Sequence, residues 1–506
     1  MINLTPLARL FMTRHVRQSL SWRGDGIENI QRHVLKYLTS RGAKTRFGHQ
    51  SSLKPTDDFE AFKGMIATRS YSDIRHDVMD MVAGERDILW PGVTRRFAQS
   101  SGTSDGRSKF IPVTDDSLKI NHYPGATDAV AFYLDMYPDS RMFGGKGFIL
   151  GGSFANNLDL KPGVKVGDLS ANLIDAINPL VNLVRIPDKT TALIEDWQVK
   201  VPALVNASIN ANITNISGVP SWFLTILKEV IRRAGADNIH QVWPNLEVFF
   251  HGGISMDPYR SQYAAITDTS KMRYIETYNA SEGFFAAQDL RDPGSMLLLL
   301  DRGVFYEFAP LGQADNPDVE TLPAWKVEPG HTYELIITAP NGLWRYRIGD
   351  TVKVISNDPL RIAIAGRTRH YINAFGEEVM VWNTDRALTE ACDKHHCQVA
   401  NYTVAPVFAD DRRHGHHQWL IEWTTPPQDT EAFAESLDMA LQALNSDYQA
   451  KRSHSIFLDR LSITPAQNGL FDLWLASTGK LGGQRKVPRL ANDRRFIDPM
   501  LSMNNQ

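Results

Sequence analysis

Residues 100–109 are the part of this 506-residue chain whose side chains best suit the binding of a polyphosphate. They include four serines, a threonine, two glycines and Lys109. Glycine lets the backbone adopt positive φ, so that successive N–H groups can point at one anion, while hydroxyls and an ammonium group supply further donors. The G-x-x-x-x-G-K-S/T spacing of nucleotide hydrolases is absent, and an ordinary surface loop is the alternative interpretation.

Residues 278–283 contribute a second set of groups suited to a nucleotide. The ring of Tyr278 offers an aromatic face for a base, Ser281 offers a hydroxyl, and the Glu282 carboxylate is an oxygen ligand of the kind that Mg²⁺ prefers. Each has a plainer alternative. Tyr278 could be a core aromatic residue at the end of a strand, and Glu282 a carboxylate favoured by the dipole at a helix N-terminus.

Two later stretches complete the set. Residues 346–350 end in Asp350, which follows a strand and a tight glycine turn, and whose carboxylate can accept hydrogen bonds from two ribose hydroxyls. Residues 366–369, Gly-Arg-Thr-Arg, form the last polar loop and lead to residues 375–377. Together the four loops predict a nucleotide-binding constellation.

These stretches resemble the adenylate-forming enzymes of the acyl-ligase and luciferase type, and more closely the GH3 family of acyl-acid amido synthetases. Residues 100–109 have the family form S-S-G-T-S-x-G-x-x-K, residues 276–283 resemble the second family motif, and residues 346–350 resemble its Y-R-x-G-D motif. Three shorter stretches look like the bacterial members of the family: residues 219–222, 255–259 and 483–489. The resemblance runs from about residue 88 to about residue 495, and six motifs in the right order make it specific.

The chain also departs from these patterns. The T-G-x-P-K phosphate loop that the broader acyl-ligase class usually has is absent, and Ala280-Ser281-Glu282 stands where plant members usually carry S-S-E. These differences bear on the choice of acid and acceptor more than on adenylation itself.

The resemblance implies an ATP-dependent ligase that works in two half-reactions. A carboxylate attacks the α-phosphate of ATP to give acyl-AMP and pyrophosphate, and the amine of an amino acid then attacks the acyl carbon and releases AMP. The implied cofactors are ATP and Mg²⁺, the implied partners are a small carboxylic acid (aryl, indole or similar) and an amino acid, and the oligomeric state is left open. The alternatives are an acyl-CoA (thioester) ligase and a non-catalytic nucleotide-binding protein.

The resemblance also assigns roles to individual residues. Those assigned to ATP and AMP are Ser100, Ser101, Gly102, Thr103, Ser104, Lys109, Tyr278, Asn279, Ser281, Tyr346, Asp350 and Arg367. The first step needs a cation at the α-phosphate, where charge builds up in the transition state. Lys486 is the predicted catalytic lysine, with Lys480 as its alternative, and Glu282 is the second predicted catalytic residue and the Mg²⁺ ligand. Three aromatic residues flank the motifs and are predicted to line an apolar slot for the acyl group, with simple packing as the alternative: Trp222, Tyr274 and Phe285.

The elements that must position these residues alternate between strands and helices. Strand patterns cover residues 148–150, 246–250 and 273–278, and helical patterns cover residues 117–137 and 220–231. This alternation predicts an α/β body with at least one large sheet. Ligands in such sheets bind at loops that follow the carboxyl ends of strands, and the loops at residues 100–109, 251–256 and 278–283 fit that position.

The fold class predicted is α/β, with a large N-terminal adenylation domain of several subdomains whose sheets are flanked by helices, and a small mobile α+β C-terminal domain. The N-terminal ATP- and acyl-binding domain spans residues 1–373. Within it, residues 303–370 are rich in strand patterns and are expected to form a smaller, mostly antiparallel unit. The C-terminal domain spans residues 374–506, with helices at 379–392 and 430–444 around strands.

The first 24 residues contain four arginines and no acidic residue before Asp25, which resembles a transit peptide. The interpretation favoured here is a first helix whose apolar face packs on the body of the protein. The residues of that face are Leu7, Leu10, Phe11 and Leu20.

The composition of the chain bears on its partners and on its location. A formal net charge of −3 gives no overall electrostatic attraction to nucleic acid or to an anionic membrane, and the longest apolar run, residues 296–300, is too short to span a bilayer. The two cysteines, Cys392 and Cys397, cannot form a disulfide framework, so a reducing, cytoplasmic location is expected. With nearby histidines they could also bind zinc, although their spacing matches no standard zinc pattern.

Overall fold

The structure is a computed structural model. It describes the whole chain except residues 1–2, 101–108, 155–159, 254–255, 293, 312, 314–315, 317–318, 368–370, 373, 375–376, 378, 408–414, 446–447, 450–451, 453–457, 479–486, 492 and 506. The chain divides into two compact units, one of residues 1–254 and 264–364 and the other of residues 255–263 and 365–506.

A 12-stranded sheet runs through the first unit. Its strands, in spatial order, are β12 (Leu322–Pro323), β11 (Phe305–Pro310), β13 (Thr332–Ala339), β14 (Leu343–Asn357), β15 (Leu360–Arg367), β10 (Met296–Leu298), β9 (Gly283–Ala287), β8 (Arg273–Ala280), β7 (Val248–His251), β6 (Ile213–Gly218), β3 (Lys146–Ile149) and β5 (Arg185–Ile186). The strands from β5 to β8 pair in parallel, and antiparallel pairing begins at β8–β9. The predicted α/β class is confirmed.

Residues 303–370 form mostly antiparallel strands, as predicted, and these strands are part of the large sheet. Strand β10 pairs with β9 on one side and with β15 on the other, so the later strands continue the same sheet. All three β10 residues are buried, so both faces of the sheet are covered at this strand.

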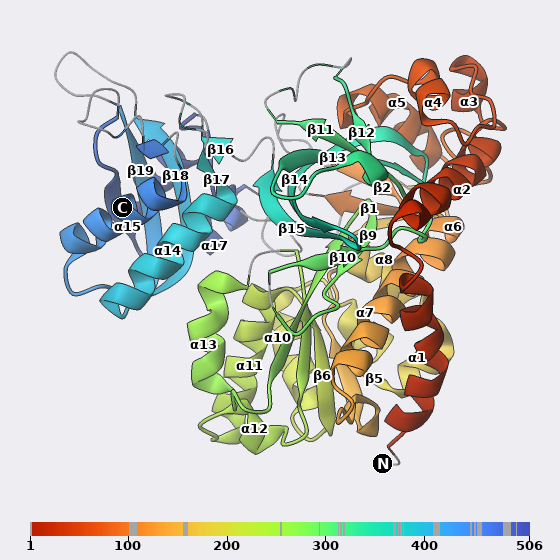
Figure 1. Ribbon diagram of the computed structural model, residues 1–506. Helices are drawn as coiled ribbons and strands as arrows, with labels where there is room; N and C mark the ends of the chain where they lie inside the picture. Colours follow the sequence, from red (N-terminus) through yellow and green to blue (C-terminus); the bar gives the residue numbers. More distant parts are fainter. Residues whose placement is uncertain are drawn as a thin grey trace. The chain divides into compact units, whose positions relative to one another are not determined.

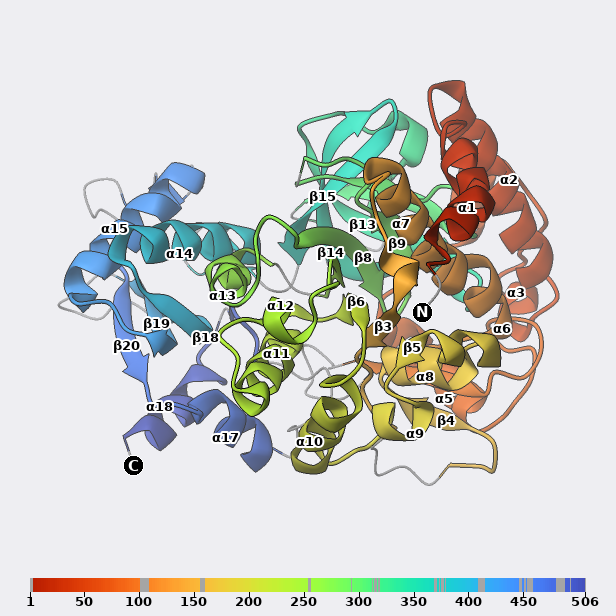
Figure 2. The same ribbon diagram turned by 90° about the horizontal axis from the view of Figure 1, so that it is seen from below.

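Helices cover both faces of the parallel part of the sheet (Figures 1 and 2), and strand β7 shows how the sequence specifies this. Successive side chains of a strand point to opposite faces. Phe249 packs edge-on against Phe223 of α11 (Pro220–Ala234), while Phe250 packs against Tyr133 of α7 (Tyr123–Met136). An apolar run without alternation is therefore buried from both sides.

Further α-helices lie among the described residues of this unit. They are α2 (Asp25–Gly42), α3 (Arg46–Gln50), α4 (Phe59–Met65), α5 (Tyr71–Val82), α6 (Asp115–Ser117), α8 (Leu169–Ala176), α9 (Lys189–Ala192), α10 (Trp197–Ser208), α12 (Ile239–Val242) and α13 (Arg260–Ile266). Helix α4 begins at Phe59, where the Asp58 side chain accepts a hydrogen bond from the Ala61 amide and caps the first turn.

A second, three-stranded sheet carries the serine-rich stretch. It consists of β2 (Lys109–Pro112), β1 (Arg96–Ser100) and β4 (Lys165–Gly167). Strands β1 and β2 are antiparallel and Ser100 pairs with Lys109. Residues 101–108, which lie outside the described residues, thus connect two paired strands.

The second unit has the predicted α+β composition. Its sheet has the order β18 (Gln398–Val407), β19 (His416–Thr425) and β20 (Ser462–Ala466). Its helices include α14 (Val381–His395), α15 (Thr430–Leu444), α17 (Leu470–Ser477) and α18 (Ile497–Asn504), and a short pair of strands, β16 (Tyr371–Ile372) and β17 (Val379–Met380), precedes α14. Trp419, Phe433 and Leu437 lie in its apolar core and are fully buried.

The first helix forms, as α1 (Thr5–Ser19), but the predicted packing face is wrong. Leu7, Leu10 and Phe11 are 54%, 71% and 72% exposed, and Leu20 is exposed as well. The opposite face packs beside α7 (Figures 1 and 2), where the His15 ring lies 2.6 Å from the buried Asp128 carboxylate. The polar contact between His15 and Asp128 therefore determines which face of α1 packs on the protein. Among the described residues, no helix is both long enough and apolar enough to cross a bilayer.

Candidate nucleotide-binding site

The carboxyl ends of neighbouring parallel strands bring polar loops to one edge of the large sheet. His251 at the end of β7 pairs with Gly218 at the end of β6 and with Glu276 of β8. The loops that follow β6, β7 and β8 therefore start at the same edge, as predicted for residues 251–256 and 278–283.

Residues 278–283 form a hairpin rather than a loop that leads into a helix. Strand β8 continues to Ala280, which pairs with Gly283 at the start of β9, so Ser281 and Glu282 make the turn. The buried Asn341 side-chain amide donates to the Glu282 carbonyl at 3.1 Å and holds this turn. The interpretation of Glu282 as a helix N-terminal carboxylate is wrong.

One buried hydrogen bond joins two of the predicted motifs. The Tyr278 hydroxyl donates to Oδ2 of Asp350 at 2.6 Å, and the two residues are 4% and 5% exposed. The Tyr278 ring is also held edge-on against Phe285, with 5.0 Å between the ring centroids. A charge-assisted bond of this length in a buried setting fixes both side chains.

A bulge in β14 aims Asp350 at this contact. Glu334 of β13 pairs with Thr351 and Ile336 pairs with Arg347, so one β13 residue faces three on β14. Gly349 lies in the bulge with φ of +85°, a conformation that other residues adopt only with strain. The expected tight glycine turn is thus an irregularity inside one continuous strand.

Residues 69–71 link the serine-rich hairpin to the same strand. The Arg69 amide donates to the Arg345 carbonyl of β14 at 2.9 Å, and the Arg347 amide donates to the Arg69 carbonyl at 2.8 Å. Two residues later, the Tyr71 hydroxyl accepts from the Phe110 amide of β2 at 2.8 Å. Sequence reasoning missed Tyr71, and a single aromatic residue at a helix start gives no signal that could have found it.

A buried lysine clamps the loop after β3. Lys200 Nζ donates to the carbonyls of Gly151 at 2.7 Å and Gly152 at 3.0 Å. The loop is also tied to Asp168, which accepts from the Ser153 amide at 2.8 Å. Burial lowers the pKa of Lys200 to about 8, while Asp168 opposes the shift. The strand pattern at residues 148–150 leads to this loop, but nothing in the sequence pointed to Lys200, which lies on α10.

Several predicted site residues cannot be located by side chain. Those outside the described residues are Ser101, Gly102, Thr103, Ser104, Lys480 and Lys486. Ser100 and Arg367 are described only as the last residues of β1 and β15. Lys109 lies beside Tyr71, with Nζ 5.8 Å from the ring centroid.

The other predicted residues divide into a group near the Tyr278–Asp350 contact and a group away from it. Tyr346 is fully buried on β14, and Asn279 follows Tyr278 with a buried Oδ1 that has no hydrogen-bond partner among the described residues. Phe285 is fully buried between the rings of Tyr278 and Tyr306.

The remaining two aromatic residues predicted for the acyl slot lie on β8 and at the start of α11, which follows β6 at the edge that carries the polar loops. Tyr274 stands near the start of β8, about 13 Å along the strand from Tyr278, and its hydroxyl lies 3.3 Å from Thr267 Oγ1. Trp222 lies half-buried in the first turn of α11. The structure therefore brings Phe285, but not Tyr274, to the nucleotide motifs.

Glu282 supplies one carboxylate for the predicted magnesium ion, while residues 101–104, predicted to bind the phosphates, lie outside the described residues. Mg²⁺ in phosphate sites commonly takes one or two carboxylates and fills its other positions with phosphate oxygens and water. Within the described part of the chain, the one cluster of three candidate metal ligands is His76, Asp77 and Asp80 on α5, where Arg46 already pairs with both carboxylates.

In the second unit, the segment that follows Lys486 is anchored on β18. The Val404 amide donates to the Arg489 carbonyl at 2.7 Å. The Arg489 guanidinium pairs with the Asp385 carboxylate and lies 5.0 Å from the centroid of the Tyr402 ring. Arg489 thereby fixes the point at which the predicted catalytic lysine joins the body of this unit, a role that sequence reasoning did not assign.

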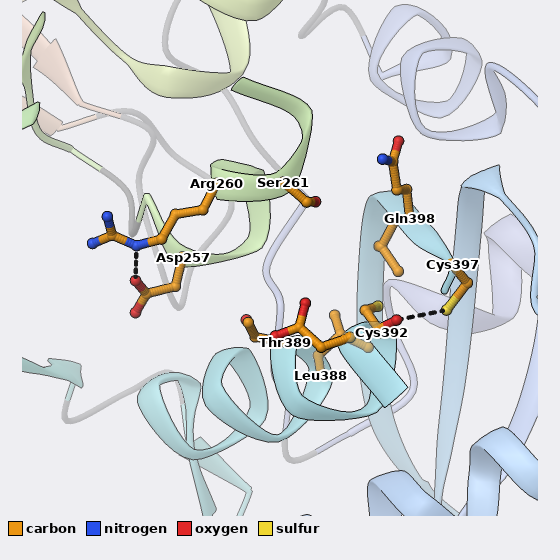
Figure 3. A pocket seen from close by; sticks show the side chains of 10 residues that line it. Asp257, Arg260, Ser261, Leu388, Thr389, Cys392, Cys397 and Gln398 are labelled. Carbon is orange, nitrogen blue, oxygen red and sulfur yellow. Dashed lines mark hydrogen bonds and ion pairs between the residues drawn. The ribbon is translucent and has the colours of Figure 1, made fainter. Parts of the chain in front are cut away.

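A cavity of about 100 Å³ in the second unit contains both cysteines in its wall. Figure 3 shows the Asp257–Arg260 ion pair, 2.8 Å long, on one side of the cavity, and Cys392 and Cys397 near the end of α14 on the other. None of the residues predicted to bind the nucleotide lines it.

The zinc alternative finds no support among the residues that the structure describes. His395 lies 2.8 Å from the Ser436 hydroxyl, and His417 lies 2.8 Å from the Glu377 carboxylate, so both rings have other partners. Neither cysteine belongs to a group of three candidate ligands in this part of the chain.

This chain matches the models of one protein family and is similar to named proteins of that family. Residues 25–181 and 177–272 match the GH3 family N-terminal domain, residues 297–367 match its central domain, and residues 383–495 match its C-terminal domain. The indole-3-acetic acid-amido synthetases GH3.3 and GH3.4 of Arabidopsis thaliana are each 23% identical to this chain, over 92% and 91% of it and 89% of each relative.

Solved structures show the same fold. The GH3.15 acyl acid amido synthetase superposes with a TM-score of 0.78 at 17% identity, over 100% of this chain and 97% of that one. A 2-hydroxyisobutyryl-CoA ligase in its postadenylation state superposes with a TM-score of 0.62 at 13% identity, over 95% and 92% of the two chains. The three matched domains follow one another in the family's order and together cover most of the sequence, and the chain belongs to the GH3 family.

Proposed function

We propose that this protein is an ATP-dependent acyl-acid amido synthetase. The observation that carries the proposal is the buried bond between Tyr278 and Asp350, which brings the second family motif and the Y-R-x-G-D motif into contact. The two motifs are separate in sequence but meet at a fixed carboxylate. This arrangement supports the view that they share a ligand better than it supports two unrelated structural roles.

We propose an aryl or indole acid as the acyl substrate and an amino acid as the acceptor. Two relatives are named indole-3-acetic acid-amido synthetases, and a GH3.15 acyl acid amido synthetase has been solved in complex with 2,4-DB. Indole-3-acetic acid and 2,4-DB are both acids that carry an aromatic group. We also propose a cytoplasmic location, which the use of only two cysteines in the chain supports.

The proposed roles of the residues follow their chemistry. Tyr278 lies beside adenine and Asp350 accepts from the ribose hydroxyls, while the hydroxyls and amides of residues 101–104 bind the phosphates. Glu282 holds Mg²⁺, which when bound would neutralise part of the phosphate charge. Lys486 stabilises the charge that builds up on the α-phosphate.

In the first step, a carboxylate oxygen of the acid forms a bond to the α-phosphorus as the bond to the pyrophosphate oxygen breaks, giving acyl-AMP and pyrophosphate. In the second step, the amine nitrogen bonds to the acyl carbon, AMP leaves, and the amine loses a proton. Because water hydrolyses acyl-adenylates, the proposed mobile C-terminal domain must keep it out during both steps.

The proposal is tested by pyrophosphate release from ATP and Mg²⁺ with a panel of aryl, indole and fatty acids, each with and without a mixture of amino acids. We expect release that depends on the acid, rises with amino acids, and yields an amide of the predicted mass. Release that rises only with coenzyme A would move the protein to the thioester ligases, and release without any acid would contradict adenylation.

The lysine assignment has its own matched pair of variants. We expect Lys486→Ala to slow acyl-AMP formation at least about a thousandfold while ATP binding is retained, because the lost charge acts only in the transition state. Lys480→Ala is the control, since it removes the same charge six residues away. If Lys480→Ala gives the large loss and Lys486→Ala does not, the two roles are reversed.

A further inference from the structure

Helix α1 turns a row of large apolar side chains to solvent. Leu4, Leu7, Leu10 and Phe11 are 46%, 54%, 71% and 72% exposed. Residues three and four apart on a helix lie on one face, so these four form a continuous strip over the first half of α1, here called the α1 strip. Isolated exposed leucines are ordinary, but a clustered strip of this kind marks an interaction surface.

Unpaired positive charge continues the α1 strip along the same helix face. Arg14 and Arg17 are exposed, as is Arg23 just beyond the helix, and none of the three forms an ion pair within the described part of the chain. Arg14 follows Leu7 by two turns, which places it about 10 Å along the axis on the same face. The formal net charge of −3 hides this local excess, because no acidic residue precedes Asp25.

The remaining face of α1 is already occupied, so the α1 strip cannot turn inward without breaking contacts. The Arg9 guanidinium donates to the Pro138 carbonyl at 2.6 Å and to the Tyr137 carbonyl at 3.2 Å. Met12 and Val16 pack against the main core. The helix lies beside α7 (Figure 2), is held on the protein by one face, and presents an apolar and basic face to solvent.

We propose that this face of α1 docks the protein on an anionic lipid surface. An amphipathic helix with leucines and a phenylalanine next to arginines lies in the boundary between headgroups and acyl chains, with the apolar side chains inserted and the arginines at the phosphates. Anionic lipid fits the charge better than a second copy of this chain does. A two-fold contact through α1 would bring this segment against a copy of itself, and no carboxylate that could pair with its arginines precedes Asp25.

The test is co-sedimentation of the full chain with vesicles of phosphatidylcholine alone and of phosphatidylcholine mixed with phosphatidylglycerol. We expect binding to the mixed vesicles, and weakening at high salt because the arginines are exposed to screening. The triple variant Leu7→Ser, Leu10→Ser, Phe11→Ser and the double variant Arg14→Glu, Arg17→Glu should each partition at least about tenfold more weakly. Leu473→Ser, at a leucine that is 60% exposed in the second unit, is the matched control and should bind as the parent chain does.

Three outcomes would overturn the proposal. The parent chain fails to sediment with the mixed vesicles, or it binds both vesicle types equally, or the α1 variants bind undiminished while thermal unfolding shows that they are folded. Sedimentation velocity of the same proteins tests the competing occupant. A dimer that the triple variant converts to a monomer, without any lipid binding, would assign the α1 strip to a second copy. These readouts need no substrate, so their result is independent of the proposed ligase activity.

Discussion

The hydrogen bond between the Tyr278 hydroxyl and the Asp350 carboxylate is the contact on which the proposed nucleotide site depends. We expect Tyr278→Phe and Asp350→Ala each to raise the KM for ATP and to lower the free energy of unfolding, because each removes one side of a buried hydrogen bond. In the double variant the second change should cost less than it does alone, giving a coupling energy of about 1–3 kcal/mol. Urea unfolding and ATP kinetics of the four proteins measure it. Additive effects would show that the bond contributes nothing.

His122 is a buried titratable group that the proposed mechanism does not use. Neither ring nitrogen has a hydrogen-bond partner among the described residues, and burial lowers the pKa of His122 to about 4 from 6.5. Between these values the unfolded chain holds a proton that the folded chain does not, so the free energy of unfolding falls as the pH falls.

We therefore expect a loss of about 2 kcal/mol between pH 7 and pH 5 that His122→Leu removes. Urea unfolding at the two pH values measures it. His76→Leu is the control, because its side chain is 88% exposed. A pH dependence that both substitutions leave equally unchanged would place the acid sensitivity elsewhere.

At the scale of elements, the loop after β3 is held by an ammonium group rather than by backbone pairing. Lys200 has a pKa lowered to about 8, against 10.5 in its ordinary state. Between these values the unfolded chain holds the proton and the folded chain has lost it, so the free energy of unfolding rises with pH across this window.

For this reason we expect Lys200→Met to cost more at high pH. At pH 7.5 it leaves the Gly151 and Gly152 carbonyls without their donor, at a cost of about 1–3 kcal/mol. At pH 9.5 the gap from the parent chain should widen by about 2 kcal/mol, since the variant has no group to lose a proton. Urea unfolding of both proteins at the two pH values tests this, and a gap that stays constant or narrows would contradict it.

The sequence predicted elements well where local signals determine them. The helical patterns at residues 117–137 and 220–231 and the strand pattern at residues 246–250 correspond to α7, α11 and β7 in the structure. It failed where contacts distant in sequence decide. The face on which α1 packs depends on a buried carboxylate, Asp128, more than a hundred residues away, and the bulge that aims Asp350 depends on its register with β13.

The same distinction between local signals and distant contacts decides which residues of the site could be predicted. Motif residues such as Tyr278 and Asp350 can be recognised by type and spacing, and the structure brings these two into contact. Supporting residues such as Tyr71, Lys200 and Asn341 carry no local signal, because each acts through a single partner that folding brings close. The core position of Phe285 also carries no local signal, because it is set by the rings of Tyr278 and Tyr306 on other strand positions.

At the scale of the whole molecule, each compact unit has an apolar core of its own. Leu335 on β13 lies in the main core of the first unit and Leu437 on α15 in that of the second, and both are fully buried. Units with separate cores unfold as separate cooperative steps when few contacts couple them. We therefore expect two transitions in urea.

Leu335→Ala should shift one of these transitions and Leu437→Ala the other, each by about 2–5 kcal/mol. Hydrogen exchange followed by mass spectrometry assigns each transition to its residues, and one transition that both variants shift equally would contradict the prediction.

The proposed function adds a prediction about the effect of ligand on these two transitions. Tyr278 and Asp350 belong to the first unit, so ATP with Mg²⁺ should raise the midpoint of the transition that Leu335→Ala lowers, by an amount that grows with ligand concentration. Lys486 belongs to the second unit, so acyl-AMP formation should disappear with whichever transition comes first, even where ATP still protects the other.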